Sequence, residues 1–203
     1  MRRVSYAVGM ACLILLFTCP AAHASFITFD RLEYSAAPGD TVTVQVQFVV
    51  PVGTVASVAA VSAKVRISGG DVPGEVSTTL TDIGQAVSGT YILDNSTGFF
   101  PTLLDPTVAI GGDATPGANE TKLPGTYAFM DLTWNISNDA FGDYFLGFDD
   151  VGLGIAGSTF LADTAGTDYL THAVGAVIHV VPEPGCLTVL LPGALWLARR
   201  RHS

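Results

Sequence analysis

Hydrophobic and polar residues alternate one by one along much of the middle of the chain. In residues 41–50 (TVTVQVQFVV), valine or phenylalanine takes every second position, and threonine and glutamine lie between them. The same two-residue period recurs in residues 61–67, 128–136 and 174–180. Side chains of an extended backbone point to opposite sides in turn, so this period predicts strands with one buried and one solvent-exposed face.

Shorter extended stretches and turn signals fill the space between these four segments. Pro38 and Gly39 form a turn signal before residue 41, and a helical period of 3.6 residues is absent throughout. We therefore expect an all-β fold, an antiparallel sandwich of two sheets with about ten strands. Residues 94–105 and 111–124 are expected to be loops. The shorter candidate strands are residues 26–29, 76–83, 87–93, 107–110, 144–148 and 157–161.

Aromatic residues are candidates for either core packing or stacking on a sugar. Trp134 shares its parity with the apolar positions of residues 128–136, so we expect it in the core. Phe99 and Phe100 are adjacent, so at least one ring must point differently from the other. Tyr169 lies among polar residues. The last three are weaker candidates for ligand contact.

The composition of residues 25–181 restricts the possible partners and sites. This range holds seventeen acidic and four basic residues, a formal charge of −13. Such an acidic surface repels phosphate backbones, so we expect no nucleic-acid binding. The range also lacks cysteine, which excludes a disulfide or a thiolate metal site within it. The three cysteines of the chain lie in the terminal segments, at Cys12, Cys19 and Cys186.

The first residues have the three parts of a secretory signal peptide. Two arginines follow Met1, an apolar run covers residues 7–17, and Ala22 and Ala24 frame a small-x-small cleavage site. We expect signal peptidase to cut after Ala24, which makes Ser25 the first residue of the exported chain. Residues 1–24 are therefore predicted to be the signal peptide.

The chain closes on a Pro-Glu-Pro triplet, an uncharged run and a cluster of arginines. The run of residues 185–198 has 14 residues, or roughly 21 Å as a helix. A hydrocarbon core is about 30 Å thick, so the run predicts a short, transient membrane helix. The alternatives are a permanent membrane anchor and a buried strand and helix of the domain. The arginines belong on the cytoplasmic side, which leaves the body outside. The run is flanked by the triplet Pro182, Glu183 and Pro184 and by the cluster Arg199, Arg200 and Arg201.

These terminal residues resemble the PEP-CTERM sorting signal of Gram-negative bacteria, in order and in spacing. The resemblance implies that residues 182–203 are a sorting tail and that an exosortase-type membrane protease recognises the triplet. It also implies an association with extracellular polysaccharide.

The body is more loosely similar to cohesins and carbohydrate-binding modules. The similarity rests on APGDTVTV at residues 37–44 and GTYAFMDLTW at residues 125–134. It implies a jelly-roll, cohesin-like sandwich over residues 25–181.

Catalytic and metal-binding motifs are sparse in residues 25–181. The two histidines, His172 and His179, are seven residues apart, so a regular strand would aim them at opposite faces. The chain contains none of the common nucleophile, phosphate or dinucleotide motifs. We therefore expect two surface imidazoles with no shared role, and no cofactor.

The acidic residues raise the question of calcium. The pair Asp149 and Asp150 follows a strand, while Asp113 and Glu120 lie in the expected loop of residues 111–124. Calcium takes six to eight oxygen ligands, which carboxylates and loop carbonyls supply. The spacing of a calcium-binding loop is absent, however, so we expect solvated loop acids.

Together these features predict an exported, non-enzymatic protein of the cell surface or extracellular matrix. It would pass through the inner membrane transiently, with signal peptidase and an exosortase as processing partners and extracellular polysaccharide as a candidate ligand. One alternative is a carbohydrate-active enzyme that uses two of the seventeen acids. Another is a calcium- or sugar-binding adhesion module.

Overall fold

A computed structural model describes residues 25–70 and 78–181, and fourteen strands account for its regular structure. The predicted signal peptide and sorting tail lie outside these residues. Within the described part, no helix is long and apolar enough to cross a membrane.

The strands form two large sheets and a small ribbon. The five-stranded sheet, here called sheet A, has the order β13 (Leu170–Ala173), β1 (Ser25–Phe29), β3 (Thr41–Val50), β10 (Gly125–Ile136) and β6 (Thr78–Gln85). The ribbon pairs β4 (Ala56–Val58) with β9 (Glu120–Lys122).

Sheet B is the larger sheet. Its order is β2 (Glu33–Ala36), β14 (Ala176–Val180), β11 (Gly142–Phe148), β5 (Ala60–Gly69), β8 (Val108–Ala114) and β7 (Phe100–Asp105). Beyond this path, β12 (Phe160–Ala162) pairs with β5.

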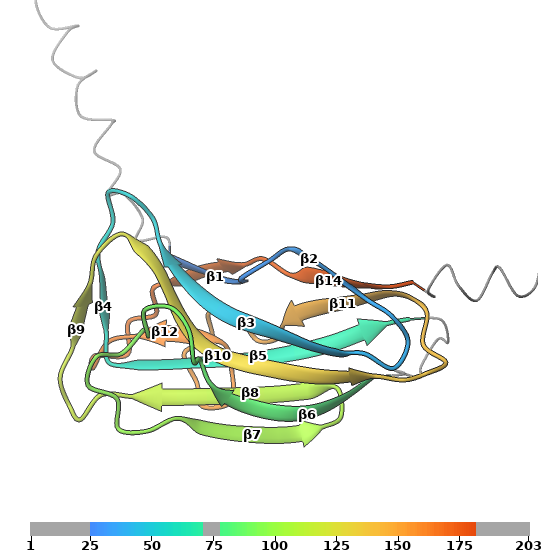
Figure 1. The fold of residues 1–203 in the computed structure, drawn as a ribbon. Coiled ribbons are helices and arrows are strands. Elements are labelled where there is room, and N and C mark those ends of the chain that lie inside the picture. The colour runs from blue at the N-terminus through green and yellow to red at the C-terminus, as the bar shows by residue number, and fades with distance from the viewer. Residues whose placement is uncertain (1–24, 71–77, 182–203) are drawn as a thin grey trace, which may run out of the picture.

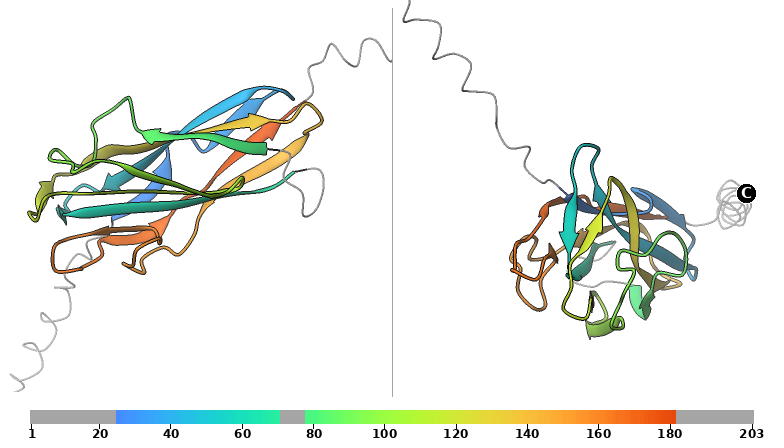
Figure 2. Two further views of the ribbon diagram at one scale, coloured as in Figure 1. Left: turned by 90° about the horizontal axis from the view of Figure 1, so that it is seen from below. Right: turned by 90° about the vertical axis from the view of Figure 1, so that its left-hand side faces the viewer.

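Sheets A and B lie face to face, which confirms the predicted all-β sandwich (Figures 1 and 2). Most ladders are antiparallel, but β1 runs parallel to β13 and β2 runs parallel to β14. These two parallel pairs join the beginning of the described chain to its end. In Figure 1 the first strand starts near the left end of the sandwich, and β14 runs toward the right end.

The core contains the side chains that the two-residue period predicts. In β3, Val44, Val46 and Phe48 are buried, and Trp134 in β10 is fully buried as expected. Phe129 departs from the strict period because a bulge between Ala128 and Met130 shifts the register against β3, so Phe129 is buried as well.

Several local predictions were wrong. Residues 94–105 contain β7, and residues 111–124 contain the end of β8 and all of β9. Residues 87–93 do not form a strand: their only β-pairing is an isolated bridge at Tyr91. Strands β2, β4 and β13 fall outside the predicted segments, because each has only three or four residues.

Candidate functional site

The predicted processing residues lie almost entirely outside the described part of the chain. The residues outside the described part are Ala22, Ala24, the triplet Pro182–Glu183–Pro184 and the cluster Arg199–Arg200–Arg201. Ser25 is the first residue of β1 and is buried, and its carbonyl accepts a hydrogen bond from the Thr171 hydroxyl at 3.1 Å. The cleavage and sorting assignments therefore stay predictions.

The two histidines lie in different strands. The strand predicted at residues 174–180 begins at Ala176 and contains His179, whereas His172 belongs to the preceding strand. His172 lies in β13 of sheet A and stacks on Phe26, with 4.9 Å between the ring centroids. His179 lies in β14 of sheet B, and its Nδ1 is 2.7 Å from the Asp143 carboxylate. The two side chains make separate contacts and do not form one site. No group of three or more metal-ligating residues occurs within residues 25–70 and 78–181.

The acid candidates for calcium are spread over three places. Asp113 lies in β8, where its carboxylate accepts hydrogen bonds from the hydroxyls of Tyr91 and Ser96 at 2.7 and 2.6 Å. It is therefore not a loop residue. Burial, followed by the hydrogen bond to Asp113, raises the pKa of Tyr91.

Glu120 lies in β9, so it is also not a loop residue, and it belongs to a cluster around Lys122. The Lys122 ammonium is 2.9 Å from both Asp94 and Glu120, and only 3% of its side chain is exposed. Burial alone would raise the pKa of Glu120, but Lys122 and the amides of Asp94 and Asn95 outweigh it and lower the pKa. This cluster fixes the segment around Asp94 to β9.

Asp149 and Asp150 follow β11, as predicted, but both are paired with cations. The Arg66 guanidinium is 2.7 Å from Asp149, and the Lys64 ammonium is 2.7 Å from Asp150. The Asp149 hydrogen bond raises the pKa of Arg66. Lys64 and Arg66 are two of the four basic residues of the body, and both project from β5 on the outer face of sheet B.

An apolar hollow lies beside these ion pairs on the same face. It has a volume of about 300 Å³. Register places Ser62, Gly112 and Phe100 side by side across β5, β8 and β7, while Phe160 of β12 faces Ser62 from the other side. The hollow is lined chiefly by Ser62, Phe100, Ile110, Gly112, Gly157 and Phe160.

The loop between β11 and β12 forms one wall of this hollow. Gly157 has a φ of +84°, a left-handed conformation that suits glycine and that other residues adopt only with strain. Leu153 and Ile155 of the same loop are 57% and 60% exposed. Large aliphatic side chains are therefore presented to solvent next to the hollow.

The outer face of sheet A has a different character. Its polar side chains bond to one another across β3 and β10: Thr43 pairs with Thr133, and Gln45 with Asp131, each at 3.0 Å. Because these groups satisfy one another, this part of the face offers fewer free polar groups to a partner. The outer face of sheet B is the candidate functional site.

The sequence pointed to part of this site. Phe99 packs edge-on against Phe129 in the core while Phe100 is 63% exposed, which confirms that the two rings differ. Tyr169 is partly buried, and its hydroxyl lies 3.3 Å from Asp163. The contributions of Ile110 and Phe160 were missed, because their strands meet only in the fold. Lys64 and Arg66 are two residues apart in a strand and therefore lie on the same face. This spacing was a signal in the sequence for the charged part of the site.

Comparison with known proteins finds solved structures with a similar fold. No family model matches the chain, and no curated protein matches it. The cohesin CaCohA2 of Clostridium acetobutylicum, solved in complex with CaDoc0917, has a TM-score of 0.58 at 19% identity, over 78% of this chain and 100% of that chain.

Two further cohesins give the same result. The cohesin of the Coh-OlpC–Doc435 complex of Clostridium thermocellum has a TM-score of 0.58 at 13% identity, over 78% of this chain and 94% of that chain. The cohesin module of a Clostridium perfringens family 33 glycoside hydrolase has a TM-score of 0.53 at 10% identity, over 79% and 98%. The described residues, 25–70 and 78–181, therefore have a cohesin-like β-sandwich fold.

Proposed function

We propose that the chain is an exported, non-enzymatic binding module of the cell surface or extracellular matrix, and that its partner is a protein that docks on the outer face of sheet B. One observation carries this proposal: the apolar hollow of about 300 Å³ beside the Lys64–Asp150 and Arg66–Asp149 pairs. Apolar anchors that fill a pocket dominate the energy of protein interfaces. Charged groups next to such a pocket set orientation and association rate.

The cohesin-like fold supports a protein partner, since several of the similar structures are cohesin–dockerin complexes. At 13–19% identity those complexes carry no residue over to this chain. The chemistry of the partner follows instead from the hollow. It requires an aliphatic or aromatic side chain that fits between Phe100, Ile110 and Phe160.

Cross-linking can test this docking face in the native host. A photo-reactive phenylalanine analogue at Phe160 should cross-link to one protein of discrete mass, whereas the same analogue at Thr43 on sheet A should not. Gly112→Leu is the blocking variant, because a Cβ at Gly112 meets only the Val61 carbonyl oxygen, at 3.9 Å, while the rest of the side chain fills the hollow. Equal cross-linking at Phe160 and Thr43, or cross-linking unaffected by Gly112→Leu, would contradict the proposal.

A panel of polysaccharides separates the alternative functions. Turnover of any glycan by the purified protein would replace the proposal with the carbohydrate-active enzyme. Retention on a glycan without turnover would favour the sugar-binding adhesion module, and retention that EDTA abolishes would favour calcium dependence. If the hollow binds a protein, as proposed, we expect the purified protein neither to turn over any glycan nor to be retained on one.

We further propose that signal peptidase removes residues 1–24 and that an exosortase-type protease processes the tail near Pro184. The sequence pattern supports this proposal. The last strand, β14, ends at Val180, so the triplet follows the folded body almost directly. Mass spectrometry of the mature extracellular protein should show an N-terminus at Ser25 and no Arg199–Arg201 cluster. If most of the extracellular protein keeps that cluster, the tail is a permanent anchor.

A further inference from the structure

Strand β7 is a free edge of sheet B with an apolar sequence. It pairs with β8 on one side only, and all six of its residues are exposed. Phe100, Leu103 and Leu104 are 63%, 53% and 55% exposed. Soluble proteins usually protect such an edge with charges, a bulge or a covering segment, because its unpaired backbone accepts another strand. Strand β7 has only part of such protection: Pro101 removes one N–H from the edge, and the register shifts between Leu103 and Asp105 at its end.

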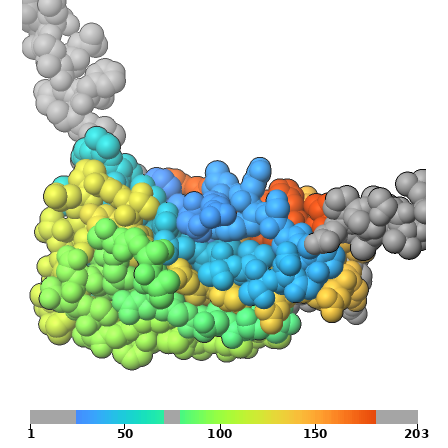
Figure 3. Space-filling view, in the orientation of Figure 1, coloured from blue at the N-terminus to red at the C-terminus, as the bar shows by residue number. Residues whose placement is uncertain are grey.

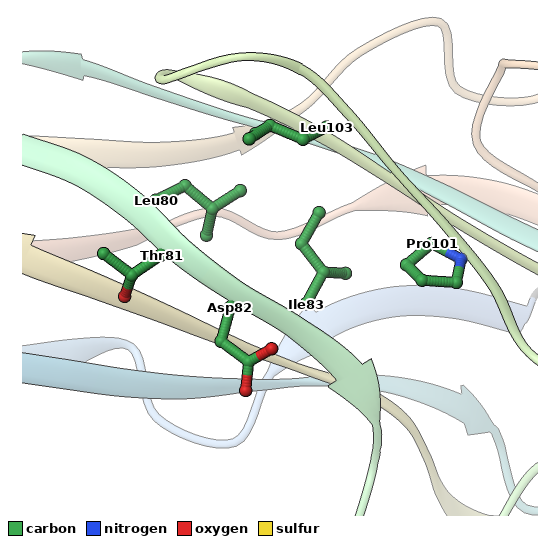
Figure 4. Close-up of a pocket in the computed structure, with 6 residues that line it drawn as sticks. All are labelled: Leu80, Thr81, Asp82, Ile83, Pro101 and Leu103. Atoms are coloured by element: carbon green, nitrogen blue, oxygen red, sulfur yellow. The ribbon is translucent and has the colours of Figure 1, made fainter.

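The inner side of β7 borders an open crevice toward sheet A. This crevice separates β7 from β6, the free edge of sheet A, and has a volume of about 250 Å³. One end is closed by the hydrogen bond from the Leu80 amide to the Pro106 carbonyl at 3.2 Å. Figure 4 shows the lining side chains Leu80, Ile83, Pro101 and Leu103, with Asp82 alongside. Figure 3 shows that the green part of the chain, which includes β6 and β7, forms the lower surface of the molecule.

The charges near this edge decide what kind of chain fits it. Residues 100–104 are uncharged, and Asp82 and Asp105 are the acids beside the crevice and at the end of the strand. The body carries a formal charge of −13, so this edge is a neutral window in an acidic surface. A second copy of the chain can approach here without placing like charges opposite each other.

We infer that β7 pairs antiparallel with β7 of a second copy, about a twofold axis at Thr102. Directly opposite residues of an antiparallel pair share one face, so this register places Phe100 opposite Leu104 of the partner subunit. It also places Pro101 opposite Leu103 of the partner subunit, toward the crevice. The edge is therefore complementary to itself, as a twofold interface requires.

The backbone of β7 fits this register. Pro101 has no N–H and is opposite Gly111 of β8, so the ladder to β8 runs through its neighbours Phe100 and Thr102. The peptide groups of Pro101 and Leu103 then face the free edge. Each Leu103 N–H can donate to the carbonyl of Pro101 of the partner subunit, and Pro101 donates nothing in return, so this part of the ladder consists of two hydrogen bonds related by the axis. Thr102 becomes a non-hydrogen-bonded pair with its own copy, for which the Cα atoms lie about 4.5 Å apart.

The electrostatics of the dimer give it a characteristic dependence on salt. Asp105 lies three residues from the axis, so the two Asp105 side chains are separated by roughly 20 Å along the paired strands. That distance exceeds the Debye length of about 8 Å at physiological salt, so they repel only weakly. The remaining repulsion comes from the two acidic bodies. Added salt screens it and should strengthen the dimer.

Disulfide formation at the axis tests the inference in the full chain. In Thr102→Cys, two cysteines about 4.5 Å apart at Cα meet the geometry of a disulfide. Oxidation of host envelopes should give a covalent homodimer on a non-reducing gel, at a higher yield in higher salt. The parental chain, with its natural cysteines, and Val87→Cys are the controls; Val87 is 91% exposed on a loop bonded to sheet A through Ser88. A dimer yield no higher than that of Val87→Cys would overturn the inference.

A second pair of variants tests the apolar contact itself. In the Thr102→Cys background, Leu103→Lys places an ammonium group in the crevice side of the interface and should lower the dimer yield by about tenfold. Val87→Lys adds the same charge elsewhere and should leave the yield unchanged. Because Leu103 and Val87 are both exposed, neither lysine should unfold the body, which protease resistance would check. An unchanged yield in Leu103→Lys would also overturn the inference.

Discussion

Lys122 is a buried lysine, and two carboxylates stabilise its charged form. Its pKa is raised because Glu120 and Asp94 outweigh burial, which alone would lower it, while the pKa of Glu120 is lowered. Glu120→Ala leaves Lys122 with the exposed Asp94 as its remaining carboxylate partner, so it should lower the free energy of unfolding by about 1–3 kcal/mol at pH 7. Urea unfolding measures this, with Asp82→Asn on the exposed part of β6 as the control.

The pH dependence of the same variant follows from the two shifts. A lowered carboxyl pKa contributes stability above the ordinary value of about 4.3, and this contribution disappears as the pH falls through the lowered value. A raised lysine pKa contributes below about 10.4 and is lost as the pH rises through the raised value. The difference between wild type and Glu120→Ala should therefore be largest between these limits and shrink toward acid. A constant difference down to pH 2 would contradict the assignment.

Trp134 combines full burial with an unmet polar group. Its Nε1 finds no hydrogen-bond partner among the described residues, and its exposed fraction is 0%. A buried donor without a partner costs about 1–3 kcal/mol, so Trp134→Phe removes that cost while it loses some packing. We expect it to destabilise the protein less than Leu132→Ala, for which about 2–5 kcal/mol is typical. Thermal and urea unfolding of both variants would test this order.

Strand β3 shows how an element's two faces differ in tolerance. Val44 is 1% exposed, so Val44→Asp buries an unpaired charge and should unfold a domain of typical stability, roughly 5–15 kcal/mol. Its neighbour Thr43 bonds Thr133 on the exposed outer face, so Thr43→Asp should be tolerated. Circular dichroism separates the two outcomes. Similar behaviour of the two variants would contradict the assignment of one buried and one exposed face to β3.

At the level of elements, the sequence predicted strands where a single period persists. Strands β3 and β10 have ten and twelve residues, and their long alternation made both predictable. The loop containing Ser88 looked like a strand because Val87 and Tyr91 flank it, but Gln45 of β3 holds Ser88 over the sheet instead. Such a contact between distant residues leaves no local pattern.

The candidate site was predictable only in part for the same reason. That Phe99 and Phe100 point differently could be inferred from their adjacency, but β7, which contains Pro101, falls in residues 94–105, which were expected to be a loop. Proline is accepted there because β7 is an edge strand, a position that only the sheet order reveals. The hollow needs β5, β7, β8 and β12 together, and no local period specifies which strands become neighbours.

For the whole molecule, the last strand is required to complete the fold. Strand β14 lies between β2 and β11, so its loss would leave β2 without a neighbour in sheet B and would turn β11, which still pairs with β5, into an edge strand. A chain truncated after Ala173 should therefore fail to fold, whereas one truncated after Val181 should keep its protease resistance and its strand-type circular dichroism. Folding of the shorter chain would show that sheet B is stable without β14.

The parallel pairing of β14 with β2 also has a mechanical consequence. Val181 follows a strand that is bonded along its length to both β2 and β11, and in Figure 1 this strand runs along the long axis of the sandwich. A pull on the chain beyond Val181, against resistance at the opposite end of the body, would load these hydrogen bonds in shear. They would then have to break together and not one after another. A module tethered through this end should consequently withstand traction that would unzip a hairpin.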